Sequence, residues 1–79
     1  MVTVRYFAGA KAAAGRGEEQ VSAADVAELK AVLEGRHGPA LGKVLSASTL
    51  LVDGLAARDP GTVLRAGVTV EVLPPFAGG

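Results

Sequence analysis

The residues with the most unusual chemistry stand at the end of the chain, in the segment Pro74-Pro-Phe-Ala-Gly-Gly79. Two prolines stiffen the exit from the preceding segment, and two glycines remove every side chain from the last positions. Fully extended, this segment spans roughly 20 Å, at about 3.3–3.6 Å per residue. We expect such a tail to thread a narrow tunnel that admits backbone but no Cβ atom, with the α-carboxylate of Gly79 as the reactive group.

A terminal carboxylate can attack the α-phosphate of ATP. The product is an acyl-adenylate, a mixed anhydride that is open to thiolysis or aminolysis. The alternative is a frayed terminus, which is common in small domains. We favour the reactive tail because of the kind of domain to which it is attached, described below.

The other potentially reactive residues do not form a catalytic group in the sequence. His37, the only histidine, ends a predicted helix, where an imidazolium on the surface complements the helix dipole. Glu18 and Glu19 are neighbours on a predicted edge strand and point to opposite faces, so we expect solvated charges rather than an acid–base pair. Lys11 is expected to be a surface charge, and Gly15-Arg-Gly17 lacks the lysine and hydroxyl residue of a phosphate loop.

Length and composition exclude several classes of protein. The 79 residues allow one domain, and eight basic and eight acidic side chains give a net charge of zero, which is unlike a nucleic-acid or membrane-surface binder. The absence of cysteine excludes disulfides and thiolate-bound metals, and we expect no metal site. Without a membrane-length apolar stretch or signal-peptide pattern, we expect a soluble, cytoplasmic domain over 1–79 with 74–79 as its tail.

Hydrophobic alternation predicts the strands. It is clearest over Val2–Phe7 and Val68–Leu73. A brief strand is expected over Glu18–Ser22 and a buried one over Thr49–Val52. Asp53-Gly54 predicts a type I′ hairpin turn that leads into one more short strand.

One long helix is predicted to begin after Asp25, which is a good N-cap and forms a capping-box-like pair with Glu28. Gly38-Pro39 should end it. Ala10–Ala14 predicts one or two helical turns, whereas Leu41–Leu45 shows no regular pattern. The apolar residues of the long helix share one face at helical spacing: Val26, Leu29, Val32 and Leu33.

This order of elements predicts an α+β roll, the β-grasp, in which one main helix packs across a small mixed sheet. Val4, Val70 and Val72 should then point toward the helix. Phe7 and Leu73 should lie on the opposite face and form with Phe76 an exposed apolar patch that leads to the tail. Such a patch indicates a partner surface, unless segment 10–14 covers it. The face opposite the helix is expected to hold four residues of the two long strands: Arg5, Phe7, Glu71 and Leu73.

The chain resembles the ubiquitin-like sulfur carriers, a family that includes the small subunit of molybdopterin synthase and its thiamine-pathway relatives. The resemblance rests on Val-Arg-Tyr-Phe-Ala at 4–8, Leu-Glu-Gly-Arg-His-Gly at 33–38, and Val-Glu-Val-Leu-Pro-Pro-Phe-Ala-Gly-Gly at 70–79. It extends over the whole chain in order and length. The ending Pro-Pro-x-x-Gly-Gly favours the molybdopterin branch.

The resemblance implies a carrier that is not itself an enzyme and binds no permanent cofactor. An E1-like adenylyltransferase would use ATP to adenylate Gly79, which would then become a thiocarboxylate. Gly78, Ala77 and Phe76 would occupy the activation tunnel. The large subunit of molybdopterin synthase, or another sulfur-accepting enzyme, would pass the sulfur to its substrate, a cyclic pterin precursor in the molybdopterin case.

Three alternatives remain open at the level of the residues. The same carrier chemistry could serve cysteine, thiamine, a thiolated tRNA base or a specialised metabolite. The chain could instead be a ubiquitin-like modifier, in which Gly79 forms isopeptide bonds with lysines of other proteins. It could also be a binding module with an inert tail.

Overall fold

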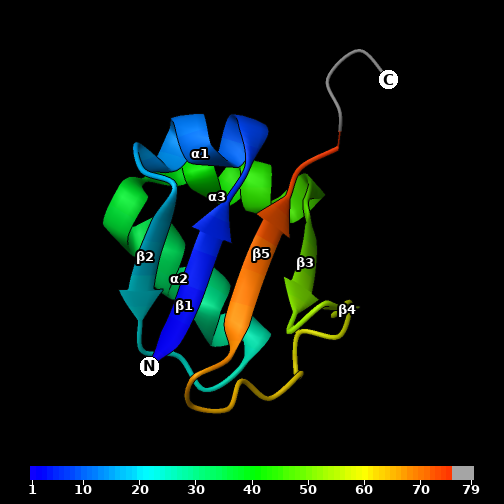
Figure 1. Cartoon of the computed structure of the whole chain (residues 1–79). Helices are drawn as coiled ribbons and strands as arrows, with labels where there is room; N and C mark the ends of the chain where they lie inside the picture. Colours follow the sequence, from blue (N-terminus) through cyan, green and yellow to red (C-terminus); the bar gives the residue numbers. More distant parts are fainter. Residues whose placement is uncertain (76–79) are drawn as a thin grey trace.

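The computed structural model describes residues 1–75, so the expectations for Phe76, Ala77, Gly78 and Gly79 lie outside the described part. Residues 1–75 form five strands and three helices (Figure 1). In chain order they are β1 (Val2–Tyr6), α1 (Ala8–Ala14), β2 (Glu18–Val21), α2 (Val26–His37), α3 (Pro39–Ala47), β3 (Thr49–Val52), β4 (Leu55–Ala56) and β5 (Thr69–Leu73).

The strands form one mixed sheet in the order β2-β1-β5-β3-β4. The two strands with the clearest alternation, β1 and β5, are parallel neighbours at its centre, with Val4 opposite Val70 and Tyr6 opposite Val72. The other pairs are antiparallel. The alternation predicted from the sequence is confirmed, because Val4, Val70 and Val72 are fully buried in the core.

Parallel pairing brings the carboxyl ends of β1 and β5 to the same end of the sheet (Figure 1). Residues 7 and 8, which follow β1, therefore lie beside residues 73 and 74 at the end of β5. Helix α1 lies at this end too, close to where the last described residues leave the domain. A site at the base of the tail is thus built from both ends of the sequence.

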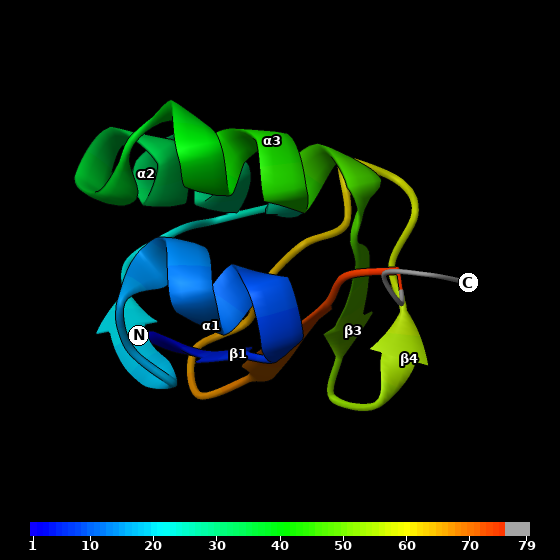
Figure 2. The ribbon, with the colours of Figure 1, turned by 90° about the horizontal axis from the view of Figure 1, so that it is seen from above.

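Helix α2 begins as the sequence predicts. The Asp25 side chain accepts a hydrogen bond from the Glu28 N–H (2.8 Å), and the Glu28 carboxylate accepts one from the Ala24 N–H (2.7 Å). The helices lie on one side of the sheet, and the other face of the sheet carries none of the described helices (Figure 2). The described helices are too short to span a membrane.

Helix α3 corrects the expectation of irregular structure over Leu41–Leu45. The Gly38-Pro39 pair ends α2 as expected, but Pro39 is also the first residue of α3, where its fixed φ and missing N–H are favourable. Leu41 and Leu45, one turn apart, are buried. Gly42 lies at the close approach to α2, since a Cβ atom there would come within 2.5 Å of the Glu34 side chain. With only two buried leucines around a glycine, the sequence pattern is too sparse to reveal this helix.

The turn at Asp53-Gly54 has the predicted positive φ at both positions, 48° and 86°. Asp53 also accepts a hydrogen bond from the Thr69 N–H at 2.9 Å, which ties this turn to the start of β5. The expectation of a buried strand over Thr49–Val52 is right for Leu50, which is buried, but the other residues of β3 are half-buried or exposed.

Candidate functional site

The base of the tail is an apolar depression at the end of the sheet. Phe7 and Leu73, the predicted partner surface, are both half-buried. With Ala8 and Pro74 they line a pocket of 300 Å³. A partly exposed aromatic ring beside an open apolar pocket is a feature that partner proteins use. The depression lies directly before the tail, whose reactive carboxylate stays a prediction.

Basic side chains border this depression. The Arg5 guanidinium lies 5.6 Å from the centre of the Phe7 ring, a cation–π contact, and its Nε atom is 3.6 Å from the Glu18 carboxylate. Both partners of this ion pair are largely exposed, so it adds little to stability. Lys11 of α1 is exposed, as predicted. The Lys11 side chain lies near a possible partner surface, since it lines a pocket together with Arg5 and Phe7.

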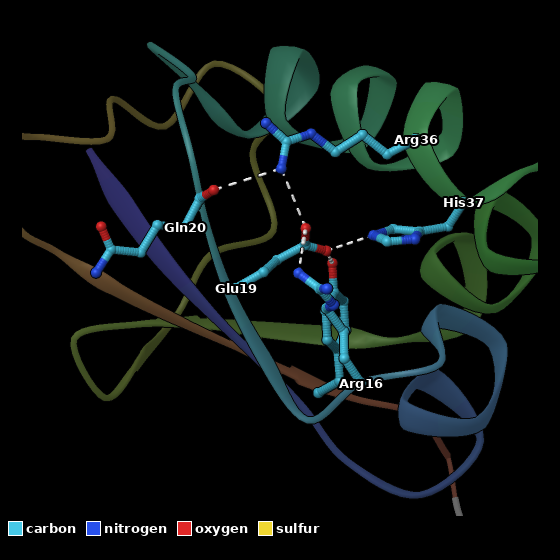
Figure 3. A network of polar contacts seen from close by, with 6 residues as sticks. Arg16, Glu19, Gln20, Arg36 and His37 are labelled. Carbon is cyan, nitrogen blue, oxygen red and sulfur yellow. Dashed lines mark hydrogen bonds and ion pairs between the residues drawn. The ribbon is translucent and has the colours of Figure 1, made fainter.

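The expectation that Glu19 is a solvated charge is wrong. Its side chain is only 3% exposed and lies among the ends of several polar groups (Figure 3). The carboxylate accepts hydrogen bonds from the Tyr6 hydroxyl (2.5 Å) and from the Arg36 guanidinium (3.1 Å), and it is hydrogen-bonded to Nε2 of His37. Arg16 lies 3.8 Å away. We call these five residues the Glu19 cluster.

The alternation of β2 explains why Glu19 is buried. Glu18 and Glu19 do point to opposite faces, as predicted, and the Glu18 side chain is 61% exposed. Glu19, however, shares the inner face with Val21 and stands opposite Val4 of β1, both of which are fully buried. The sequence offered this signal in the apolar residue two positions later. The sequence did not reveal the hydrogen-bond partners that offset the cost of burying the charged carboxylate.

The environment of Glu19 shifts two pKa values. Burial by itself raises the pKa of the Glu19 carboxyl, but the hydrogen bonds from Tyr6, His37 and Arg36 outweigh burial and hold that pKa below its ordinary value. Burial, and then the hydrogen bond to Glu19, raise the pKa of the Tyr6 phenol far above its ordinary value. Tyr6 therefore stays a neutral donor and Glu19 a charged acceptor at neutral pH.

His37 is not the surface residue that the sequence predicts, because its side chain is only 15% exposed. Its ring meets the Tyr6 ring edge-on, with centroids 6.2 Å apart. His37 packs within the Glu19 cluster, in keeping with the structural role expected for it. Within residues 1–75, no group of three histidine, aspartate or glutamate side chains lies close enough together to hold a metal ion.

Leu55 of β4 is an exposed apolar residue that the sequence did not reveal, and its exposed fraction is 76%. It follows the Asp53-Gly54 turn on the edge strand and lines a second depression, of 390 Å³, with Val52 and Ala57. An apolar residue directly after a hairpin turn was the available signal. Leu55 is thus a second candidate for contact with a partner protein.

Comparisons with known proteins support the fold and the family. The chain is similar to SAMP1 of Haloferax volcanii (28% identity, TM-score 0.84), and the match covers 99% of this chain and 98% of that one. It is similar to a chain in the complex of subunits 1 and 2 of the molybdopterin-converting factor of Helicobacter pylori (27%, TM-score 0.75, coverage 99% and 97%). The Amycolatopsis orientalis BexX/CysO complex also contains a similar chain (20%, TM-score 0.80, coverage 100% of both), which supports the fold alone. No curated protein matches the chain.

These similarities agree with the β-grasp fold predicted from the sequence, in which helices pack on one face of a mixed sheet. The model of the ThiS family matches residues 4–79, which is nearly the whole chain. The protein therefore belongs to the ThiS family of ubiquitin-like sulfur carriers.

Proposed function

We propose that the chain carries sulfur on the C-terminal carboxyl group of Gly79. In the first step a carboxylate oxygen attacks the α-phosphate of ATP on an E1-like adenylyltransferase, and pyrophosphate leaves. In the second step hydrosulfide attacks the acyl carbon, AMP leaves, and a thiocarboxylate and a proton result. The observation that carries this proposal is the match to the ThiS family over residues 4–79, which includes the Gly-Gly end.

The client that we propose is molybdopterin synthesis, with the chain as the small subunit and a larger subunit as the sulfur-accepting partner. Two observations support it: the Pro-Pro-x-x-Gly-Gly ending, and the similarity to a chain of the two-subunit molybdopterin-converting factor. In this proposal the partners are the enzymes and the chain is their co-substrate. The reaction needs ATP and takes place in the cytoplasm.

The partner surface of this proposal is the depression formed by Phe7, Ala8, Leu73 and Pro74. It lies directly before the tail, so a partner that holds it also fixes the start of the six residues from Pro74 to Gly79. Fixing one end of a short tail limits where its other end can reach. Phe76, Ala77 and Gly78 would then lie along the tunnel that leads to the active site of the partner, with Gly78 in its narrowest part, where no Cβ atom fits.

A second candidate is a protein modifier, in which Gly79 is joined to lysine amines of other proteins. The similarity to SAMP1, a small archaeal modifier protein, favours it specifically. Both functions begin with the same adenylate and differ in the nucleophile that attacks it, sulfide in one case and a lysine amine in the other.

Mass spectrometry of the intact protein tests the proposal. The purified chain is incubated with the E1-like enzyme of its own organism, ATP and sulfide, and the expected result is a mass increase that corresponds to exchange of one oxygen for sulfur. The same mixture without ATP should show none. If the chain stays unmodified with every E1-like enzyme of that organism, the carrier function is wrong.

A tagged chain expressed in its own organism separates the two candidates. Higher-mass conjugates on a blot that disappear when Gly79 is deleted would favour the modifier. A blot with the free chain alone, together with the thiocarboxylate in the mass spectrum, would favour the carrier.

A further inference from the structure

We propose that a furrow beside the base of the tail binds an acidic segment of the partner protein that carries one large apolar side chain. This inference rests on the proposed function for the identity of the partner, the enzyme that activates or receives the tail. The furrow runs from Pro74 and Leu73 across Phe7 and Ala8 to Lys11 and Arg16.

The furrow is continuous because three adjoining pockets share Ala8. The first, of 300 Å³, lies between Phe7 and Leu73 at the base of the tail. The second, of 480 Å³, lies between Arg5 and Lys11. The third, of 440 Å³, extends from Lys11 to Arg16. Together they form one surface that changes from apolar to basic with distance from the tail.

Small residues keep the furrow open. Ala8, Ala12, Gly15 and Gly17 line it and present no bulky side chain. The Lys11 side chain passes close to Gly17, since a Cβ atom added to Gly17 would be 3.5 Å from the Lys11 Cε atom. The alanines and glycines of segment 8–17 thus leave room that a larger apolar residue would fill.

The charge of the furrow is positive, although the chain as a whole has a net charge of zero. Three cations, Arg5, Lys11 and Arg16, and one carboxylate, that of Glu18, line it. Arg5 is paired with Glu18, and Arg16 lies 3.8 Å from the Glu19 carboxylate. Within residues 1–75, no carboxylate comes within 4 Å of the Lys11 amine. Glu19 is shared among Arg16, Arg36 and His37, and the Arg16 side chain remains 58% exposed. An exposed amine beside a groove is available to a carboxylate of a partner.

The occupant follows from this gradient. The pocket between Phe7 and Leu73 fits a leucine, methionine or aromatic side chain, and the basic side chains beyond it fit carboxylates. A nucleic acid fits less well, because Glu18 stands within the furrow and one end is apolar. We therefore commit to an acidic protein segment, with the apolar residue nearest the tail.

Nuclear magnetic resonance titration tests the furrow without any partner enzyme. The probes are three blocked pentapeptides with a leucine followed by four glutamates, four glutamines or four lysines. The glutamate peptide should shift the amide resonances of Phe7, Ala8, Lys11 and Arg16 in a saturable way. Equal or tighter binding of the lysine peptide, or shifts confined to other faces, would overturn the inference. Tighter binding of a short oligothymidylate to the same residues would overturn it as well.

Matched charge reversals sharpen the titration. Lys11→Glu should weaken binding of the glutamate peptide about five- to tenfold, whereas Lys43→Glu, an equal change of charge at an exposed position of α3, should leave it unchanged. Lys11→Met, which keeps the aliphatic stem, should have an intermediate effect. Binding by Lys11→Glu with the affinity of the unaltered chain would show that the furrow is not the site.

The same variants distinguish failure of the furrow from failure of the carrier function. In the adenylation assay with the E1-like enzyme, Lys11→Glu should raise KM with little change in kcat, and this increase should shrink at high salt. Normal kinetics of Lys11→Glu at low salt would overturn the furrow while the thiocarboxylate still forms. No thiocarboxylate in any variant, together with binding of the glutamate peptide at Lys11, would overturn the carrier function and retain the furrow.

Discussion

Tyr6 and Phe7 are neighbours in the sequence, yet they belong to two different regions. In one region a charged group is buried and paired, and in the other the charged groups are exposed. Tyr6 points into the Glu19 cluster, where one buried carboxylate is hydrogen-bonded by the tyrosine, Arg36 and His37. Phe7 stands at the open furrow, beside the exposed cations Arg5 and Lys11. The first region is closed and polar, and the second is open and partly apolar.

The difference shows what each region is suited to do. Within the described residues, every buried side-chain polar atom of the Glu19 cluster has a hydrogen-bond partner. The hydrogen bonds from Tyr6 and Arg36 to Glu19 join β1 and the end of α2 to β2. The buried groups of the cluster are already engaged, which leaves little for a partner protein. Arg16, which is 58% exposed, is the one member of the cluster that also lines the furrow. At the furrow, the apolar pocket and the Lys11 amine are available. We therefore expect changes in the cluster to affect stability, and changes at the furrow or tail to affect recognition and chemistry.

The largest effect is expected at the tail. Deletion of Gly79 should abolish ATP-dependent activation, because the carboxylate then falls short by about one residue step of 3.3–3.6 Å, as large as the attack distance itself. The melting temperature should stay nearly unchanged. Pyrophosphate release in the presence of the E1-like enzyme and a thermal melt measure the two effects.

Two further variants control this result. A one-residue extension after Gly79 should abolish activation as well, and Gly78→Val should do much the same through its branched side chain. Normal activation of the extended chain would contradict the carrier function, and a large fall in melting temperature would show that the tail is structural.

Removal of the buried carboxylate should be the most damaging change to the fold. Glu19→Ala leaves the Tyr6 hydroxyl and the His37 ring without their shared partner, whereas the half-exposed Arg36 can be hydrated. The change should cost about 1–3 kcal/mol of unfolding free energy. Glu18→Ala, on the exposed face of the same strand, should cost under about 0.5 kcal/mol. Urea unfolding at neutral pH measures both. Equal losses would mean that the cluster is not a structural anchor.

At the furrow, Phe7→Ala should impair recognition more than stability. Loss of an aromatic anchor at the centre of an interface costs about 2 kcal/mol or more, which corresponds to an increase in KM of roughly thirtyfold. The kinetics of adenylation measure it. Val63→Ala, which truncates an exposed apolar residue (69%) that does not line the furrow, serves as the control. The same KM in both variants would contradict a role for Phe7.

The smallest effect is expected from pH. Because the pKa of Glu19 is lower in the folded chain than in the unfolded one, its contribution to stability is present above the ordinary value of 4.5 and is lost as the pH falls through the lower folded value. The free energy of unfolding, measured with urea, should therefore decrease as the pH falls below the ordinary pKa of 4.5. Glu19→Gln should flatten this dependence and Glu18→Gln should not. An unchanged profile in Glu19→Gln would assign the acid sensitivity to other groups.

Several features were determined by the sequence alone because they depend on neighbouring residues. Alternation gave the two central strands, and Asp25 with Glu28 gave the start of α2. Asp53-Gly54 gave the type I′ turn, since few residues other than glycine, asparagine and aspartate accept positive φ. Motifs at both ends of the chain, together with its order of elements, were enough to predict the family.

Tertiary structure alone decided the rest. Helix α3 depends on its packing against α2 through Gly42, and Glu19 is buried because Tyr6, Arg36 and His37 converge on it from other elements. The furrow likewise exists because parallel pairing of β1 with β5 brings residues near position 8 beside residues near position 74. Contacts of this kind join residues far apart in the chain, and no local pattern specifies which partners will meet.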